Sequence, residues 1–600
     1  MPVKRTFGWV QNPGDLKKLK KVVGIFKPGS PENLDLINTK LPLLLTYNLI
    51  SADDYNTFTA ELTKSNIIID YSLLKGKGSG SGRRQDAICT GIIQAIIEGQ
   101  QNKTYTDSAG NSITIKKPYT DDWTAEGFLR WAISCGLLEY INADDKCKIT
   151  TLGEELANAP VNSPAETEAL TKALLSYPPV IRILSLLQEQ DEQTKFDLGS
   201  KLGFKGEMGF TSMPQDAYLC DYCEATTAGE RANVRSNEEG DSDKYARGIA
   251  SWCMQMGWIS SDTKDVTETY RRHTYTARLQ TYTITRKGEK ALIKARGNSS
   301  NPRIPRILMF EMLASNKAPG ANYLRYLRAC IIKSLSTTEK SLEQIKEVLK
   351  GYELDVDTSA IKDQIEGLIS IGIEISETEG KYKLLDKIER LEIPARTECV
   401  KDNVIDIKDR VRTKLTHLDH KYLVLIDLAY SDAATRAKKN ADAREFEIQT
   451  ADLFTKELSF NGQRLGDSRK PDVIISYGTD GTIVDNKSYK NGFNISRTCA
   501  DEMSRYINEN NLRQKTLNPN EWWKNFDPVV STYTFLFITS YLKGQFEDQL
   551  EYVSNANGGI KGAAIGVESL LYLSESIKRG RLSQSDFYNN FNNKEMIYTI

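Results

Sequence analysis

Two aspartates and one lysine near the end of the chain have the residue types of a hydrolytic site. Asp472 follows an Arg-Lys-Pro run, and Asp485-Asn486-Lys487 begins thirteen residues after it. Two carboxylates and a phosphate oxygen suit Mg²⁺, a hard cation that prefers oxygen ligands and can activate water beside a phosphodiester. The lysine can hold the attacking water and stabilise the developing negative charge. The set therefore favours Mg²⁺-dependent phosphodiester hydrolysis, with both aspartates as metal ligands.

The segments that carry these residues are predicted to form a β-hairpin. Residues 473–477 and 482–489 are rich in β-branched residues, and the turn-forming residues 478–481 lie between them. Side chains two apart on a strand share a face, so Asp485 and Lys487 should project together, with the first aspartate brought beside them by the hairpin. Taken alone, the pattern also fits two turn aspartates and an exposed lysine.

A helix is predicted before this hairpin, and it carries Glu445 and Glu447. These two carboxylates are candidates to support a second metal ion. Solvent exposure is the favoured interpretation for both, and the number of ions per site is left open.

Charge is balanced overall but unevenly distributed along the 600 residues, which are enough for three to five domains. Residues 270–306 hold ten Lys or Arg against one acid, whereas residues 353–392 hold eleven Asp or Glu against five Lys or Arg. The basic stretch is predicted to follow a phosphate backbone and the acidic one to avoid it. The alternative for the basic stretch is a solvated face plus a linker.

Targeting signals and structural metal motifs are not evident. The N-terminus lacks the apolar segment of a secretory signal, and no apolar run approaches membrane-spanning length. Nine scattered cysteines suit a reducing cytoplasm, and Cys220-x-x-Cys223 lacks the further ligands that a zinc site needs. None of the three histidines stands in the motif of a ββα-metal nuclease. We therefore expect a cytoplasmic protein that uses carboxylates for its chemistry.

One arrangement recurs three times before residue 390. An apolar helix ends at Gly136, at Gly257 and at Gly372, and each time two short strand-like segments follow. Helix, glycine cap, strand, turn and strand form the end of a winged helix-turn-helix, which places a recognition helix in the DNA major groove. We predict that the first two copies read DNA. The third is acidic and is predicted to serve as a packing module.

Several longer motifs accompany this repeat. They are Thr6-Phe7-Gly8-Trp9-Val10-Gln11-Asn12-Pro13-Gly14, Ser176-Tyr177-Pro178-Pro179, Ser242-Asp243-Lys244-Tyr245-Ala246-Arg247 and Asn518-Pro519-Asn520-Glu521-Trp522-Trp523. By these motifs, in order and along nearly its whole length, the chain resembles the FokI-like type IIS restriction endonucleases.

The resemblance implies a multidomain α+β protein that binds the asymmetric duplex sequence GGATG. Such an enzyme makes a staggered, Mg²⁺-dependent double-strand cut at a fixed distance to one side. Three winged-helix-like subdomains precede an α/β cleavage domain of the PD-(D/E)xK fold. The expected boundaries are 1–155 and 156–300 for the two reading subdomains, 301–393 for the packing subdomain, 394–407 for a linker, and 408–600 for the cleavage domain.

The resemblance also implies which residues contact DNA. In the first subdomain these are Gln11 and Asn12 on an N-terminal arm, Arg84 before the recognition helix, Gln100 on that helix, and Trp123. In the second subdomain they are Glu239, Lys244 and Arg247, whose types suit cytosine and guanine edges. An asparagine of the family is Ser236 here, so neighbouring Arg235 or Asn237 is expected to compensate. A tryptophan of the family is Glu238.

One catalytic set cuts one strand at a time, so a double-strand cut calls for a second cleavage domain. Asp501 and Arg505 lie four apart on a predicted helix, residues 499–508. The resemblance implies that they form a two-fold contact between two copies, in a transient homodimer on DNA. The alternative is an ion pair within the helix.

A nuclease domain that cuts without sequence specificity must be inactive away from the recognition site. The resemblance implies that the cleavage domain packs against the recognition part and swings out on DNA, and we predict that the acidic third subdomain helps to hold it away from phosphate. A host would need a matching DNA methyltransferase, though not as a physical partner. The alternatives are a DNA-binding regulator with an inactive nuclease-like domain and a strand-specific nicking enzyme.

Overall fold

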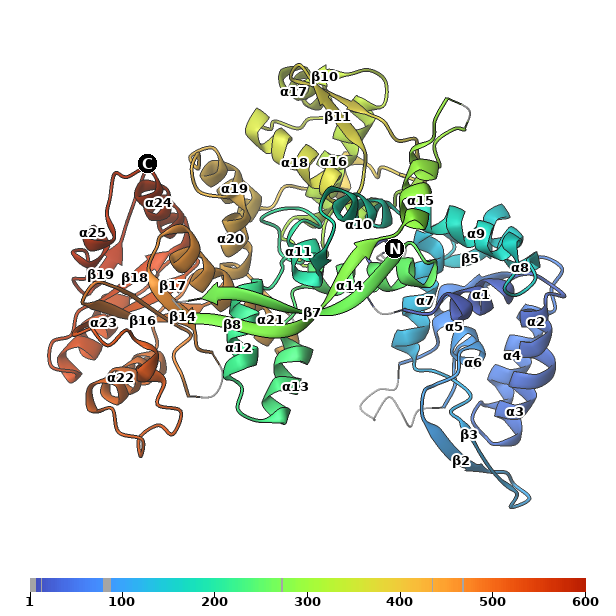
Figure 1. The fold of residues 1–600 in the computed structure, drawn as a ribbon, viewed down its shortest axis with the longest axis horizontal. Helices are drawn as coiled ribbons and strands as arrows, with labels where there is room; N and C mark the ends of the chain where they lie inside the picture. Colours follow the sequence, from blue (N-terminus) through green and yellow to red (C-terminus); the bar gives the residue numbers. More distant parts are fainter. Residues whose placement is uncertain are drawn as a thin grey trace.

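Four lobes, in chain order, make up the molecule (Figure 1). The computed structural model describes residues 7–11, 13–78, 88–270, 273–299, 301–433, 435–466 and 469–600. Three lobes of helices and short strands precede a fourth with an open six-stranded sheet. The expectation of a multidomain protein with mixed helices and strands is confirmed.

The threefold repeat is visible as three units with one topology. In each unit a helix is followed by two paired antiparallel strands. The units are α7 (Asp122–Ser134), β4 (Leu138–Ile141) and β5 (Lys146–Ile149); α14 (Asp241–Gln255), β7 (Ile259–Tyr270) and β8 (His273–Ile284); and α18 (Thr358–Ser370), β11 (Ile375–Thr378) and β12 (Lys381–Leu384).

The predicted glycine caps and a shared third strand complete the repeat. Gly136, Gly257 and Gly372 have φ of +71°, +71° and +98°, the left-handed region that ends a helix at little cost only for glycine. A short strand pairs with the second wing strand in every unit. These are β1 (Ile68–Asp70) on β5, β6 (Gln193–Thr194) on β8, and β10 (Lys340–Ser341) on β12.

The recognition subdomains share one hydrophobic core. Trp131 of α7 and Trp252 of α14 are fully buried and stack with ring centroids 4.4 Å apart. Such a pair contributes about 0.5–1.5 kcal/mol beyond its buried area. The N-terminal arm is fixed over this junction, because Trp252 Nε1 donates to the Pro13 carbonyl at 2.6 Å.

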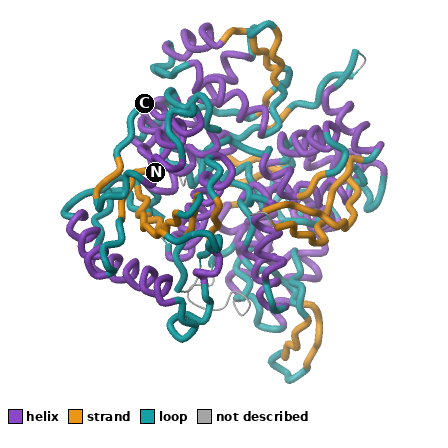
Figure 2. Tube along the Cα trace, turned by 60° about the vertical axis from the view of Figure 1, so that its left-hand side comes forward, coloured by secondary structure: helices purple, strands orange, loops and turns teal. Residues whose placement is uncertain are grey.

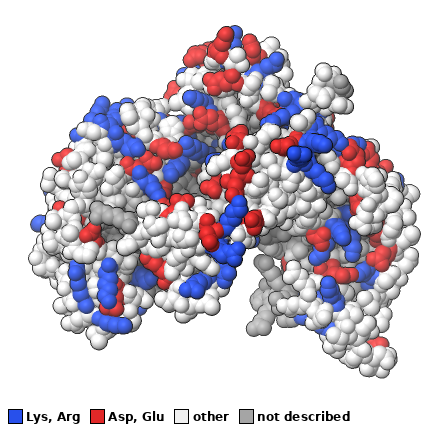
Figure 3. Space-filling view, in the orientation of Figure 1, with Lys and Arg blue, Asp and Glu red and all other residues white. Residues whose placement is uncertain are grey.

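Part of the basic stretch 270–306 has another role than the predicted one. Arg296 donates to Glu374 at 2.5 Å, and the fully buried Arg306 lies 3.2 Å from Asp386. Arg303 pairs with both carboxylates. Arg296 thus joins the second subdomain to the acidic third one, within which Arg303 and Arg306 are paired, since buried charges persist only when paired. Acidic side chains also stand out on the third subdomain, the upper lobe in Figure 3.

The fourth lobe, which is the predicted cleavage domain and is called the cleavage lobe below, is a three-layer α/β domain whose sheet has the order β14-β15-β16-β17-β18-β19. The first three strands are antiparallel and the rest parallel. Its strands are β14 (Asn461–Arg464), β15 (Val473–Tyr477), β16 (Asp480–Lys487), β17 (Thr532–Thr539), β18 (Gly562–Gly566) and β19 (Lys594–Met596). Alternate residues face opposite layers.

Two helical layers cover this sheet. Val473, Val484 and Leu536 face one layer, and Ile474 and Ile483 face the other. The first layer contains α19 (Asn403–Arg412), α20 (Val424–Ala429), α21 (Arg436–Asp452) and α24 (Val567–Lys578), and the second contains α22 (Arg497–Leu512), α23 (Phe546–Ala556) and η6 (Trp522–Asn525). The predicted linker, 394–407, includes the first turn of α19.

No single helix in the described parts of the chain is long and apolar enough to cross a membrane. α9 (Pro164–Leu175) and α10 (Pro178–Glu189) pass that test only as a pair bent by 88°, and their apolar residues lie in the core. All nine cysteines are free thiols. In Figure 2 the hairpin of β2 (Asn102–Thr106) and β3 (Ser112–Lys116) projects beyond the body of the first subdomain.

Candidate active site

The predicted hairpin is present, and its register brings the three candidate residues together. β15 and β16 pair from Val473 opposite Val484 to Tyr477 opposite Asp480, with a two-residue turn. This register puts Asp472 opposite Asp485. Ile474 and Ile483 face the α22 layer, and by alternation the two aspartates and Lys487 face it too. One surface of the sheet therefore carries all three.

Direct hydrogen bonds hold this arrangement. The Asn486 backbone N–H donates to Asp472 Oδ2 at 2.7 Å, across the hairpin. Lys487 Nζ lies 2.9 and 2.8 Å from the two carboxylate oxygens of Asp485, a residue only 3% exposed. On the other face Asn486 Nδ2 donates to Thr450 Oγ1 at 2.7 Å, which ties β16 to α21.

The carboxylates of Asp472 and Asp485 lie so close together that they do not easily carry charge at the same time. Burial, then the charge of Asp485, then that of Glu447 hold the pKa of Asp472 well above its usual range. Burial alone would lower the pKa of Lys487, but Asp485 and Asp472 more than offset it and raise that pKa. Lys487 is therefore an ammonium ion at neutral pH and acts as a charge, not as a base.

Glu445 and Glu447 are less exposed than the sequence interpretation held. Glu447 has a side chain only 13% exposed, receives a hydrogen bond from Arg464 Nε at 2.8 Å, and contributes to the raised pKa of Asp472. Glu445 accepts from Gln449 Nε2 at 2.9 Å, and burial raises its pKa. The sequence held one sign of this burial: Glu447 lies three residues before Thr450, so the two side chains share one face of the helix.

The donor set fits a hard divalent cation that is shared with substrate. Asp472 and Asp485 supply carboxylate oxygens, and a cation between them would relieve the repulsion that raises the pKa of Asp472. Among the described residues, no three His, Cys, Asp or Glu side chains could by themselves hold a metal ion. The remaining ligands would be water and a phosphate oxygen.

The predicted base-reading residues of the second subdomain lie around the N-terminal end of α14. Arg235, Ser236 and Asn237 are exposed at the end of α13 (Ala228–Asn237). Glu239 follows in the turn before α14 and binds Lys195 as well as Arg247, at 3.2 Å from the latter. Lys244 and Arg247 rise from the first two turns of α14. The set is contiguous, as a reading surface requires.

The first subdomain agrees only in part with the prediction. Trp123 is 49% exposed in the first turn of α7, and Gln11 Nε2 donates to Asp241 of the second subdomain at 3.4 Å. Gln100 is not on a helix, because α6 (Ile92–Ile96) ends where Ile97 turns to an extended backbone. Gln100 instead lines a cleft of about 270 Å³ that also contains Lys18, Lys103 and Lys117. Asn12 and Arg84 lie outside the described residues.

The predicted dimer residues occupy the outer side of α22. Asp501 is exposed and pairs with Arg497 at 3.2 Å, not with Arg505. Arg505 is shared between Glu502 at 3.5 Å and Glu509 at 3.8 Å. The intrahelical Asp501–Arg505 pair, which was the alternative interpretation, is therefore not formed.

The cleavage lobe docks on the second subdomain through α21. Ile448 inserts into an apolar cluster with Met213 and Tyr218 of the second subdomain. Arg444 Nη2 donates to Glu238 Oε1 at 2.6 Å, and Lys456 pairs with Asp216. Beside these contacts lies a cleft of about 500 Å³. It is lined by Asn237, Glu239 and Lys244 from the predicted reading surface and by Arg444, Glu447 and Arg464 from the cleavage lobe.

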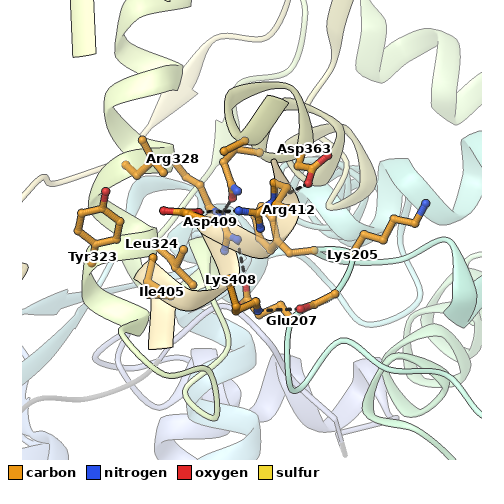
Figure 4. A pocket seen from close by; sticks show the side chains of 15 residues that line it. Lys205, Glu207, Tyr323, Leu324, Arg328, Asp363, Ile405, Lys408, Asp409 and Arg412 are labelled. Carbon is orange, nitrogen blue, oxygen red and sulfur yellow. Dashed lines mark hydrogen bonds and ion pairs between the residues drawn. The ribbon is translucent and has the colours of Figure 1, made fainter. Parts of the chain in front are cut away.

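A second contact joins the cleavage lobe to the third subdomain. Figure 4 shows a small pocket where residues of the second subdomain, the third subdomain and α19 meet. Arg412 of α19 donates to Asp363 of α18 at 2.8 Å, and Asp363 also binds His420 at 2.8 Å. Lys408 donates to the Gly206 carbonyl and to Asp427, both at 2.8 Å.

Comparisons with known proteins agree along the whole chain. Four family models match, namely the FokI recognition domain subdomain 1 at residues 5–159, subdomain 2 at 166–300, the FokI D3 domain at 313–380, and the FokI cleavage domain at 401–598. The type II restriction enzyme FokI of Planomicrobium okeanokoites is 37% identical over 99% of both chains. This chain belongs to the FokI family of type II restriction enzymes.

Other relatives agree with this assignment. The type II restriction enzyme StsI of Streptococcus sanguinis is 30% identical over 95% of this chain and 92% of its own. From chain length and motif variants we expected a particular likeness to StsI, yet its identity of 30% is lower than the 37% found for FokI. The structure of FokI superposes with a TM-score of 0.85 at 36% identity, and that of FokI bound to DNA with 0.86 at 35%. Each comparison covers 99% of this chain and all of the other.

Proposed function

We propose that this FokI-family enzyme binds the asymmetric duplex site GGATG and makes a staggered, Mg²⁺-dependent double-strand cut at a fixed distance to one side. The observation that carries the proposal is the shared surface of Asp472, Asp485 and Lys487 on one hairpin. An inactive nuclease domain on a DNA-binding regulator would have no reason to keep two buried, mutually repelling carboxylates beside a lysine.

The chain's own residues would divide the chemistry between them. Asp472 and Asp485 would hold Mg²⁺, which supplies a Lewis acid for the phosphate and an activated water. Lys487 stays protonated, holds the attacking water and stabilises the negative charge that develops on the phosphate oxygens. The Asn486 backbone bond to Asp472 keeps that carboxylate in place as charge moves.

Recognition is assigned to the two surfaces of the first two subdomains. Gln11, Gln100 and Trp123 would contact one part of the site, and Glu239, Lys244 and Arg247 the other. Exposed Arg235 and Asn237 flank Ser236, where the family has an asparagine, and either can supply the missing donor. Asn12 and Arg84 remain candidates by resemblance.

Docking of α21 beside the reading surface supports a restrained nuclease. Glu238 and Asp216 of the second subdomain hold Arg444 and Lys456 of the cleavage lobe. Asp363 of the third subdomain holds Arg412. DNA bound at the neighbouring reading residues would compete with the cleavage lobe for this region. Binding of the DNA site would therefore favour release of the cleavage lobe. Two released cleavage domains would then pair through Asp501 and Arg505 as a transient homodimer on DNA.

Sequencing of the ends produced from random-sequence DNA tests the proposal. In the presence of Mg²⁺ every cut should lie at one fixed offset from a GGATG site, on the same side, with a constant stagger. Cuts without a common neighbouring sequence would refute the recognition part. A single nick at each site would favour the strand-specific nicking alternative.

A further inference from the structure

Glu509 is a buried carboxylate of α22 that the proposed chemistry does not use. It is only 2% exposed. It accepts hydrogen bonds from Trp522 Nε1 at 2.7 Å and from Asn518 Nδ2 at 2.9 Å. Arg505, a predicted dimer residue on the same helix, lies 3.8 Å from its other oxygen. A charge is held inside a protein only by such partners, so the contacts of Glu509 fix its position firmly.

Asn518 connects Glu509 to the loop that carries Asp472. Its side chain is fully buried, and the same Nδ2 that binds Glu509 donates to the Arg469 carbonyl at 2.7 Å. An amide NH₂ carries two hydrogens, so both bonds form at once. The amide oxygen accepts from the Asn520 backbone N–H at 3.0 Å. Asn518 is therefore a fixed bridge between α22 and residues 469–472.

The loop needs such a bridge because its backbone is strained. Arg469 has φ of +68°, in the left-handed region that residues other than glycine rarely adopt. Three residues later the Asp472 carbonyl accepts from Leu465 N at 2.8 Å, and its carboxylate accepts from Asn486 N at 2.7 Å. Asn518 anchors one end of the segment, and β14 and β16 anchor the other.

We propose that Asn518 and Glu509 are positioning residues that connect the Asp472 loop to α22, the predicted pairing helix. Pairing of two cleavage domains would then hold the Asp472 carboxylate, a proposed metal ligand, more firmly in place. The proposal rests on the proposed function for the pairing itself. In the single chain Arg505 is shared between Glu502 and Glu509. When Arg505 turns to an aspartate of a second copy, the charge of Glu509 is left to Asn518 and Trp522, and both bonds strengthen.

Asn518→Ala tests the bridge in the full-length protein, with Asn520→Ala as the matched control. Asn520 is exposed in the same motif, and only its backbone N–H is used. We expect the single-turnover cleavage rate of Asn518→Ala at saturating Mg²⁺ and enzyme to fall about 10- to 100-fold, because small misplacements of reacting groups have effects of this size. Affinity for the site should stay unchanged. A rate within twofold of the control would overturn the proposal.

A readout without metal separates positioning from general destabilisation. In Mg²⁺-free protein, amide hydrogen exchange of residues 469–475 should speed up in Asn518→Ala and not in Asn520→Ala. Exchange in α14 and β17 should stay the same. Faster exchange throughout the cleavage domain would mean a merely structural role. If Asn518→Ala does not fold, Glu509→Gln keeps the shape and the hydrogen-bond acceptor while it removes the charge, and it should show the same pattern more weakly.

The link to pairing has its own experiment. An Asp472→Ala copy cannot cut but still offers a pairing surface, so adding it should stimulate cleavage by the unmodified chain. Glu509→Gln should bind that copy equally well by sedimentation yet be stimulated at least about threefold less. Equal stimulation would overturn the link. If the unmodified chain is not stimulated at all, the proposed dimer fails, whereas the Asn518 result stands on its own.

Discussion

The two long helices that flank the hairpin of Asp472 and Asp485, α21 and α22, face different surroundings. The outer side of α21 packs against another part of the same chain, since Ile448 is buried there and Arg444 binds Glu238 of the second subdomain. The outer side of α22 carries exposed Asp501 and meets solvent. In the proposed mechanism, restraint and pairing would therefore use opposite faces of the sheet. The surface released from the recognition part would not be the surface that meets a second copy.

The largest expected effect concerns the hairpin between the two helices. Asp472→Ala should lower cleavage by about 10³-fold or more, since it removes a metal ligand and leaves Lys487 beside a single carboxylate. Binding to the site, measured by gel shift, should not change. Asp480→Asn, at the turn end of the same hairpin, is the control. Persistent cutting by Asp472→Ala would disprove the site assignment.

On the α22 side, reversal of one charge should weaken pairing. We expect Arg505→Asp to lower cleavage by roughly tenfold or more at low enzyme concentration, because the introduced charge repels the aspartate of a second copy. The double reversal, Asp501→Arg with Arg505→Asp, should recover most of the rate. The measurement is cleavage against enzyme concentration. A rate that is linear in concentration and unaffected by these changes would show that one copy suffices.

On the α21 side, loss of one carboxylate should loosen the restraint. Glu238→Ala leaves Arg444 without its partner, and we expect cutting of DNA that lacks the site to rise roughly 3- to 30-fold. Glu189→Ala, which removes an exposed carboxylate elsewhere in the second subdomain, should leave it unchanged. Off-site cutting is measured on a plasmid without GGATG. If Glu238→Ala behaves like the control, docking through α21 is not what restrains the nuclease.

The smallest expected effect is a pH dependence of the contact with the third subdomain. The two ring nitrogens of His420 face Asp363 at 2.8 Å and the Leu415 carbonyl at 3.2 Å, so the ring can donate to both oxygens only when it is protonated. The hydrogen bond to Asp363 raises the pKa of His420 above its usual value. A raised pKa in the docked state means that this stabilisation is complete below about pH 6.5 and is lost as the pH rises through the raised value.

Limited proteolysis at residues 394–402 measures this change. Cleavage of the linker should become faster from pH 6 to pH 8.5 in the unmodified chain. His420→Asn should remove most of that dependence, whereas Asn508→Ala at an exposed position of α22 should not. A flat profile in the unmodified chain would mean that Arg412 alone maintains the contact with Asp363.

Local patterns allowed much of this molecule to be predicted from its sequence. Strand alternation and turn residues predicted the hairpin, and three glycines at helix ends predicted the repeat. Both features depend on residues that are neighbours in the chain. Contacts between distant segments were not predictable. Glu238 and Arg444 are 206 residues apart, and Arg306 meets Asp386 only in the folded protein. The burial of Glu447 likewise depends on Arg464, which belongs to another element.

The two-residue turn between β15 and β16 has a consequence for how this enzyme can vary. Most surface turns accept an added or missing residue, because nothing downstream depends on their length. Here a shift of the pairing by one residue would rotate Asp485 and Lys487 to the side of α21 and turn Asn486 toward Asp472. If the proposed site is correct, the length of this turn matters as much for catalysis as the identity of the acids, and we expect insertions there to abolish cleavage.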